Sequence, residues 1–357
     1  MSESIQSELA ALPVPGCGIS LEDAKVRVRA AEADGQVAVS LSCGFPVQGL
    51  RWELESAIAA KLASLGLSLR SLELTARITS HAVQPKLSPL PNVRNIIAIG
   101  SGKGGVGKST TAVNLALALA ADGARVGVLD ADVYGPSVPM MLGLTGRPDS
   151  PDGKTIEPMR AHGIEAMSIG LLVEQEPPMI WRGPMATSAL TQLLNETRWG
   201  GEEGLDYLIV DLPPGTGDIQ LTLAQKIPVA GAVIVTTPQD VATLDARKAL
   251  KMFEKVEVPV LGLVENMAVH VCSNCGHTEH VFGEGGGARM STQYGVAMLG
   301  SLPLELTIRE QGDAGVPVVI SAPDSSASLA YRLTARRLAL ALALRPRVTP
   351  SISASLL

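Results

Sequence analysis

Within the first 80 residues, short stretches alternate apolar and polar positions. The stretches with this period of two, which predicts strands that bury one face, are residues 24–30, 37–42 and 72–78. Residues 50–65 instead place apolar side chains four positions apart, which predicts a helix with one buried face. We therefore predict a small α/β unit in the order strand, strand, helix, strand.

From residue 95 onward, continuous apolar runs alternate with longer stretches of helical period. The runs that predict buried strands are residues 95–100, 125–130, 164–169, 207–211, 232–236 and 260–266. The clearest predicted helices are residues 109–121, 185–194, 241–254 and 325–344. This alternation is typical of an α/β fold with a mostly parallel sheet covered by helices on both faces.

A proline-rich stretch separates the two patterns. It holds Pro85, Pro89 and Pro91 without a sustained period, which predicts a linker. The length of 357 residues, at roughly 150 residues per domain, also favours two domains. The predicted division is a small α/β domain at 1–80, the linker at 81–94, a larger domain at 95–345 and a flexible tail at 346–357.

Composition narrows the classes of partner. The chain is 46% hydrophobic and 3% aromatic with a net charge of -6, so we expect no nucleic-acid partner. Its longest apolar runs, at 115–121 and 338–344, are far shorter than the ~20 residues that span a bilayer, so we expect no membrane partner. The acidic N-terminus lacks the positive start of a signal peptide, and four cysteines cannot form a disulfide scaffold in this length. We expect a cytoplasmic protein.

A glycine-rich loop joins the first strand of the larger domain to the helix that follows. Its sequence, GSGKGGVGKSTT from Gly100 onward, matches a P-loop, in which backbone N–H groups surround a polyphosphate at a helix N-terminus. Lys108 is expected on the β- and γ-phosphates and the Ser109 hydroxyl on Mg²⁺. The other loop residues expected to bind the nucleotide are Gly102, Gly104, Gly105, Val106, Gly107 and Thr110. A glycine-rich turn that binds nothing is the alternative.

A second lysine, Lys103, makes this loop resemble the deviant P-loop of septum-positioning, plasmid-partition, arsenite and tail-anchored-protein ATPases and of the nitrogenase iron protein. In those relatives the extra lysine reaches the nucleotide of a partner chain. The resemblance therefore implies a homodimer with ATP between two chains, in which Lys103 acts with Lys108 in binding and catalysis. A surplus solvated lysine is the alternative.

Carboxylates follow two of the predicted strands. Asp130 and Asp132 follow one of them, and Asp211 ends another within LIVDLPPGTGD, a Walker B pattern. Oxygen ligands at the carboxyl edge of neighbouring strands suit Mg²⁺, and we expect Asp211 to hold its hydration shell. Resemblance to the same ATPases implies that Asp132 orients the attacking water and that Asp130 supports the metal behind its direct ligands. A carboxylate that caps a loop is the alternative for either residue.

Two further residues complete the expected nucleotide site. Gly215 can present a backbone N–H that senses the γ-phosphate, although turn chemistry after Pro213 and Pro214 also explains a glycine there. Asn266, at the end of the strand predicted at 260–266, matches the position where relatives hydrogen-bond the base. Its amide can donate and accept at an adenine edge. A strand-ending turn residue is the alternative.

A different chemistry is indicated by the sequence HVCSNCGHTEH at residues 270–280. Cys272 and Cys275 are spaced to bind one soft metal centre, but zinc or an iron-sulfur cluster normally takes four ligands. His277 and His280 would complete a zinc site with very little chain between the ligands. A dithiol redox centre would place the pair at a helix N-terminus. The other interpretations are a metal-free structural pair, with the histidines as polar loop residues, or a centre shared by two chains.

Segments at 265–287, 299–304 and 313–317 make the larger domain resemble the Mrp/ApbC family of iron-sulfur cluster carriers. The resemblance implies a homodimeric ATPase that binds a [4Fe-4S] cluster between two chains through Cys272 and Cys275. It further implies transfer of the cluster to apo iron-sulfur proteins, and contact with cluster assembly proteins.

The first domain resembles the small iron-sulfur-assembly-associated domain that is often fused ahead of this ATPase. Cys43 stands near the place where relatives carry a cysteine-containing turn, so a role beyond the core is open for it. For Cys17 we expect a structural role.

The alternative function is that of a positioning or partition ATPase that recruits a partner on membrane or DNA. Relatives that bind membranes use a C-terminal amphipathic helix with basic residues facing the lipid. The helix predicted at 325–344 contains Arg332, Arg336 and Arg337, but it continues the α/β pattern. We expect it to cover the sheet.

Overall fold

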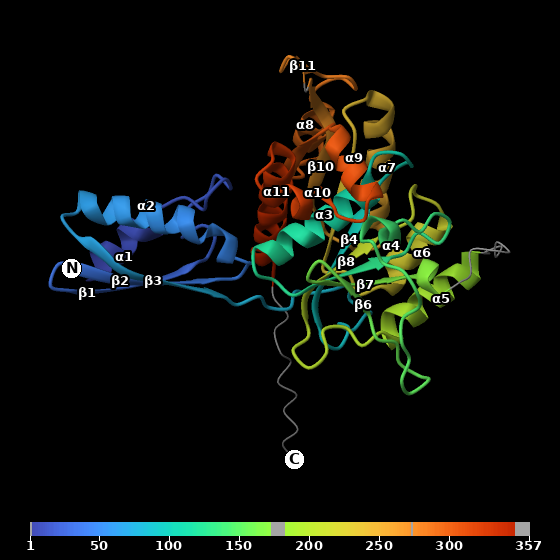
Figure 1. Cartoon of the computed structure of the whole chain (residues 1–357), viewed down its shortest axis with the longest axis horizontal. Coiled ribbons are helices and arrows are strands. Elements are labelled where there is room, and N and C mark those ends of the chain that lie inside the picture. The colour runs from blue at the N-terminus through green and yellow to red at the C-terminus, as the bar shows by residue number, and fades with distance from the viewer. Residues whose placement is uncertain (1, 173–182, 273, 347–357) are drawn as a thin grey trace.

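The computed structural model describes residues 2–172, 183–272 and 274–346 (Figure 1). A small N-terminal unit lies beside a larger α/β body, and a hairpin projects from the top of the body in this view. The predicted tail lies, from residue 347 onward, outside the described residues. No helix in the described part of the chain has the length and apolar character needed to cross a bilayer.

The N-terminal unit is a three-stranded sheet with packed helices. Its elements are α1 (Ser2–Ala10), β1 (Arg27–Ala33), β2 (Gln36–Cys43), a 3-10 turn (Gln48–Leu50), α2 (Arg51–Ser64) and β3 (Ser68–Ala76). The central strand β2 is antiparallel to β1 and parallel to β3. The predicted order of strands and helix is confirmed, with α1 in addition. The first strand begins later than predicted because Lys25 has φ +55°, which a strand does not accept.

The body is built on one large, mostly parallel sheet in the order β11-β10-β9-β4-β8-β5-β7-β6, with β12 paired to β10. Its strands are β4 (Val93–Gly100), β5 (Val126–Asp130), β6 (Met159–Ala161), β7 (Ile164–Ser168), β8 (Leu205–Asp211), β9 (Gly231–Thr236), β10 (Val260–Val271), β11 (Thr278–Glu279) and β12 (Met298–Pro303). The antiparallel pairs among these described strands are β6 with β7 and β11 with β10.

Helices cover both faces of this sheet, so the predicted fold class is confirmed. On one face, α3 (Lys108–Ala121) and α11 (Ser326–Ala343) contribute to a first buried apolar cluster. On the other, α5 (Gly183–Glu196), α6 (Asp218–Lys226) and α7 (Asp240–Lys255) contribute to a second. The shorter helices are α4 (Val138–Met141), α8 (Gly286–Tyr294), α9 (Leu306–Asp313) and α10 (Val318–Ser321).

The end of a predicted strand in the body is also wrong. The strand predicted at 260–266 continues as β10 to Val271, so Asn266 lies inside the strand rather than at its end. Glu265 and Asn266 interrupt the apolar run, although the apolar residues 267–269 continue the strand beyond them. The run that predicts a buried strand therefore ends at a polar pair that lies inside the strand.

The segment between the two sheets is anchored to the body. The Gln84 side chain is buried, and its Nε2 donates to the carbonyls of Ala224 at 2.7 Å and Ile227 at 3.1 Å. Its Oε1 accepts from the backbone N–H of Val229 at 3.0 Å. A single glutamine thus fixes the middle of the proline-rich stretch beside α6.

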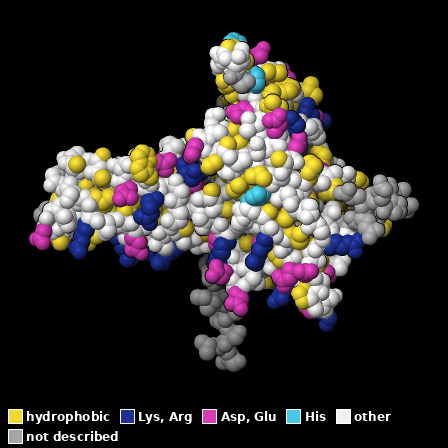
Figure 2. All heavy atoms as spheres, viewed as in Figure 1, with side chains coloured by type: hydrophobic (Ala, Val, Ile, Leu, Met, Phe, Trp, Pro, Cys, Tyr) yellow, Lys and Arg dark blue, Asp and Glu magenta, His cyan; other side chains and the backbone are white. Residues whose placement is uncertain are grey.

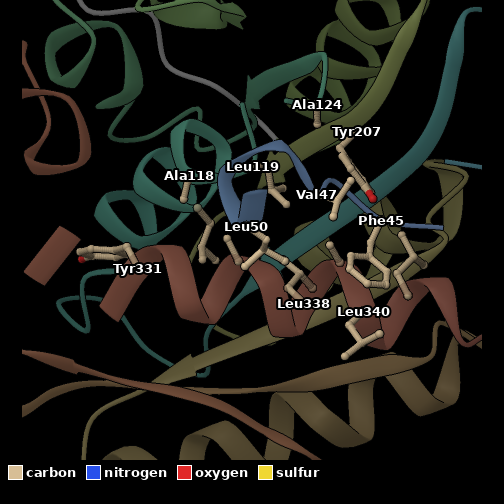
Figure 3. Close-up of a cluster of buried hydrophobic side chains, with 14 of the residues drawn as sticks. Phe45, Val47, Leu50, Ala118, Leu119, Ala124, Tyr207, Tyr331, Leu338 and Leu340 are labelled. Atoms are coloured by element: carbon tan, nitrogen blue, oxygen red, sulfur yellow. The ribbon is translucent and has the colours of Figure 1, made fainter. Parts of the chain in front are cut away.

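The N-terminal unit and the body share one buried apolar core (Figure 3). Phe45, Val47 and Leu50 of the first unit lie in the same cluster as Leu119 of α3 and Leu338 of α11. These five side chains are each at most 2% exposed. The unit is therefore packed against the body, and the division into separate domains stays a prediction.

Candidate functional site

The P-loop lies between β4 and α3. Gly105 and Gly107 have φ values of 80° and 78°, in the left-handed region that glycine adopts without strain. Gly102 lies directly against α7, where a side-chain carbon would overlap the backbone of Asp245. These glycines let the loop curl around the N-terminus of α3, where free N–H groups and the helix dipole attract phosphate.

Lys108 and Asp211 form a buried ion pair at the start of α3. Lys108 Nζ lies 2.5 Å from Asp211 Oδ1, and the two side chains are 6% and 0% exposed. The same Nζ donates to Ser109 Oγ at 3.2 Å. Burial raises the pKa of Asp211, and the positive charge of Lys108 opposes that shift. The lysine expected on the phosphates therefore lies beside the carboxylate expected near the metal.

The donor set around Asp211 fits a magnesium ion. Its second oxygen, Oδ2, is buried and has no hydrogen-bond partner among the described residues. The Ser109 hydroxyl lies close enough to lower the pKa of the same carboxyl group. A carboxylate oxygen and a hydroxyl at one place are the hard oxygen ligands that Mg²⁺ prefers.

Asp130 pairs with Asp211 in the register of β5 and β8 and is fully buried. Burial and the Asp211 charge raise the pKa of Asp130 to about 7. One oxygen accepts from the Asp132 N–H at 3.1 Å, and the other accepts from the Val138 N–H at 3.2 Å and Ser168 Oγ at 3.1 Å. This carboxyl group therefore fixes the loop that carries Asp132.

Asp132 lies on the wall of a cleft of about 230 Å³ that follows the P-loop. The cleft is lined by Ser101, Lys103, Gly104, Gly105, Gly107, Lys108, Ser109, Thr110, Asp132, Ser137, Met141 and Pro214. Lys103 is half-buried, and its Nζ donates to Gln239 Oε1 at 3.4 Å, just ahead of α7. The structure thus brings both lysines and Asp132 to one cleft.

Two neighbouring segments are hydrogen-bonded to the P-loop itself. Gly215, with φ +98°, donates its N–H to the Ser101 carbonyl at 3.0 Å. Asn266 on β10 is buried, and its Nδ2 donates to the Val106 carbonyl at 2.9 Å. Both predicted residues therefore contact the loop that is expected to hold the phosphates.

A second, more apolar pocket of about 220 Å³ adjoins the P-loop. Gly107, Thr110 and Asn266 line one side of it, and further lining residues include Pro303, Leu304, Ile308, Asp313 and Tyr331. Its position beside the loop suits a flat base. No sequence pattern indicates a role for the residues between 303 and 313, although the motifs around them carry the family resemblance.

Cys272 and Cys275 lie at the tip of the hairpin formed by β10 and β11. The Cys272 N–H donates to the His277 carbonyl at 2.9 Å, and the Gly276 N–H donates to the Cys272 carbonyl at 2.9 Å. Backbone N–H groups of Asn274 and Cys275 lower the pKa of the Cys272 thiol, and the Cys275 side chain adds to this shift. Cys272 is half-buried and Cys275 is exposed, so both thiols are accessible, and the Cys272 thiol loses its proton more readily than an ordinary cysteine.

The surroundings of Cys272 and Cys275 also bear on the interpretations of the pair as a zinc site or a dithiol redox centre. Within the described residues, no group of three or more His, Cys, Asp and Glu side chains is placed to hold a metal ion. The pair lies in a hairpin loop, whereas a dithiol redox centre is expected at a helix N-terminus. Among the described residues, one chain thus supplies two thiols, and no His, Asp or Glu side chain is placed to join them as a further ligand.

The other two cysteines lie in apolar surroundings. Cys43 is buried, and burial raises the pKa of its thiol to about 12. Cys17 is half-buried, and burial raises its pKa as well. A thiol held in its neutral form is a poor nucleophile and metal ligand, which favours a structural role for both.

The chain is similar to proteins whose type is known. The family model described as ParA, NUBPL iron-transfer P-loop NTPase, matches residues 92–339. An iron-sulfur cluster carrier protein of Pseudomonas fragi is 59% identical over 269 residues, which cover 75% of this chain and 93% of that protein. A protein of the same description from Escherichia coli K12 is 60% identical over 259 residues, covering 72% of this chain and 69% of that protein.

A solved structure gives a further match. The nucleotide-binding protein of Archaeoglobus fulgidus, in complex with ADP, is 39% identical with a TM-score of 0.56. The alignment covers 63% of this chain and 87% of that protein.

Proposed function

Because the chain belongs to the family of NUBPL-type iron-transfer P-loop NTPases, we propose that it carries iron-sulfur clusters and uses ATP to do so. The observation that carries this proposal is the presence of two distinct sites on one strand. β10 supplies Asn266 to the P-loop and ends at the hairpin that bears Cys272 and Cys275. Hard oxygen donors at one site and soft thiols at the other suit Mg-ATP and a cluster without competition.

The nucleotide site binds ATP in the cleft along the P-loop. Lys108 contacts the β- and γ-phosphates, Ser109 and Asp211 hold Mg²⁺, and the base occupies the adjoining pocket beside Asn266. When bound, the metal neutralises charge on the phosphates. Asp132 orients the attacking water, while Asp130 keeps the Asp132 loop in place through its three hydrogen bonds.

The cluster is the cargo, and two chains bind it together. A [4Fe-4S] cluster takes four thiolates, and each chain offers Cys272 and Cys275. A homodimer supplies the missing two, and in that dimer Lys103 reaches the nucleotide of the partner subunit. Slow hydrolysis is coupled to loading or transfer of the cluster. Recipients are apo iron-sulfur proteins, cluster assembly proteins are further partners, and the setting is the cytoplasm.

Anaerobic reconstitution with iron and sulfide tests the cargo. Wild type and Cys17→Ala should bind equal amounts of cluster, whereas the double variant Cys272→Ala, Cys275→Ala should bind almost none. If the double variant binds as much cluster as wild type, the carrier function is wrong. Stoichiometric zinc without a brown chromophore in anaerobically purified protein would indicate a zinc-bridged dimer instead.

The alternative of a positioning or partition ATPase is not favoured. Two basic residues of α11 are engaged inside the molecule, since Arg332 and Arg336 both contact Asp122. Co-sedimentation with anionic liposomes in the presence of ATP distinguishes the two functions. Strong sedimentation that is independent of the cysteine pair would favour the alternative.

A further inference from the structure

The hairpin that carries the cysteines has little support of its own. β10 and β11 pair in two registers, His270 with Glu279 and Val271 with Thr278. A two-stranded ribbon is marginally stable by itself, even when it is longer than this one. Figures 1 and 2 show the hairpin projecting from the body, with histidine side chains on its surface in Figure 2. Side-chain contacts at its base therefore decide how well the thiols are held.

His280 closes the hairpin across its base. Its Nδ1 lies 2.8 Å from the carbonyl oxygen of Ala268. A carbonyl oxygen only accepts, so Nδ1 carries the proton and donates it. The residue that follows β11 is thereby bonded back to β10. The two paired positions of the strands lie between this bond and the cysteines.

His270 fastens the hairpin to the body. Its Nδ1 donates to the Leu304 carbonyl at 2.9 Å, and the Leu304 N–H donates to the Val269 carbonyl at 2.7 Å. Leu304 directly follows β12, which pairs with β10 in the large sheet. Two hydrogen bonds of opposite direction thus join the base of the hairpin to the residue that follows β12.

We infer that His270 and His280 are positioning residues for the cysteine pair, which act through their Nδ1 atoms and do not ligate the cargo. The inference rests on the proposed binding of a cluster by Cys272 and Cys275. The two imidazoles keep the thiols in one arrangement before a cluster arrives. Less conformational entropy is then lost when the cluster binds.

Asparagine and glutamine substitutions separate this role from ligation. Asparagine places its side-chain N–H₂ near the position of Nδ1, whereas glutamine reaches the position of Nε2. His270→Asn and His280→Asn should behave like wild type, and the matching alanine and glutamine variants should not. His277→Ala is the matched control, because His277 is an exposed histidine in the same loop and contributes its backbone carbonyl to the hairpin.

Hydrogen exchange on the cluster-free protein provides a first readout that does not depend on the proposed function. In the alanine and glutamine variants, the amides of Cys272 and Gly276 should exchange roughly fivefold faster, the factor for one net hydrogen bond. The asparagine variants and His277→Ala should match wild type. Unchanged exchange in both alanine variants would overturn the inference, whether or not wild type binds a cluster.

Cluster retention and spectroscopy provide the second readout. The half-life of the reconstituted cluster under an iron chelator should shorten roughly fivefold in the alanine and glutamine variants, and recover with asparagine. Rescue by glutamine instead of asparagine would overturn the inference. A strongly coupled histidine nitrogen in pulsed EPR of the reduced cluster would do the same, since it would show direct ligation.

Discussion

Arg336 donates from its Nε to Asp122 Oδ2 at 2.9 Å, and this contact joins the end of the P-loop helix to the C-terminal helix. Asp122 directly follows α3, is 2% exposed, and also accepts from Arg332 at 3.1 Å. Arg336 in turn donates to the Gly49 carbonyl at 3.0 Å in the N-terminal unit. One helix therefore begins at the nucleotide site and ends where the N-terminal unit is packed.

Replacing Gly49 by alanine should destabilise this junction. A side-chain carbon there would overlap the Asp122 carboxylate and crowd Arg332 Nη2 at 2.7 Å. We expect a loss of roughly 2–3 kcal/mol in the free energy of unfolding, measured by urea denaturation. Gly44→Ala is the matched control, because its new carbon would meet Ala343 at an ordinary 3.5 Å. Equal stability of the two variants would contradict the role of Gly49.

Replacing Lys108 by alanine should abolish ATP hydrolysis and also destabilise the fold. The change leaves the Asp211 carboxylate buried without its counter-charge, at a cost of about 3–5 kcal/mol. The double variant Lys108→Ala, Asp211→Asn removes that charge, so it should regain much of the stability and stay inactive. Phosphate release and urea denaturation measure the two effects, and sustained turnover by Lys108→Ala would remove the P-loop assignment.

Substitutions of Asp132 and Asp130 should separate an effect on catalysis from an effect on stability. Asp132→Asn removes a carboxylate from the wall of the cleft, so kcat should fall about 100-fold with little change in stability. Asp130→Asn disturbs a buried group that accepts three hydrogen bonds, so it should lose about 1–3 kcal/mol. Steady-state kinetics and thermal unfolding of both variants provide the comparison. Full activity of Asp132→Asn would exclude it from orienting water.

Alkylation should distinguish the cysteines by their pKa values. The thiolate is the reactive form, so a lowered pKa moves the onset of reaction to lower pH and a raised pKa moves it higher. Cys272 in the cluster-free protein should therefore react with iodoacetamide with a midpoint below its ordinary 9.0, whereas Cys43, with a pKa of about 12, should stay unmodified at pH 8.

Peptide mass spectrometry after short exposures follows the labelling at each cysteine. Urea-unfolded protein is the control, since all four thiols should react there. Modification of Cys43 at the rate of Cys272 in the folded protein would contradict the burial of Cys43.

Features that depend on neighbouring residues in the sequence were predictable. The P-loop, the Walker B aspartate and the buried strands depend on glycine placement and apolar runs, which local sequence records. The extension of β10 past Asn266 was not predictable, because the polar pair Glu265 and Asn266 interrupts the apolar run inside the strand. The helix α1 was also missed, since Ile5 and Leu9 become core residues only when the rest of the unit folds over them.

Contacts between distant segments explain the rest of what the sequence did not show. Asp122 and Arg336 are 214 positions apart, and nothing near either residue indicates the other. The pocket beside Asn266 is likewise completed by residues around 303–313, which approach it only through the pairing of β10 with β12. The spacing of the cysteines shows their chemistry, but the histidine contacts at the hairpin base depend on backbone carbonyls that carry no sequence signature.

The length of β10 separates the two chemistries electrically. At roughly 3.3 Å per residue, the strand from Asn266 to Cys272 spans on the order of 20 Å. Charges exposed to salt water are screened beyond about 8 Å, so the phosphates of a bound nucleotide should act only weakly on the thiols through the solvent. An influence of ATP that travels along β10 as a displacement of the strand should therefore persist when the ionic strength is raised.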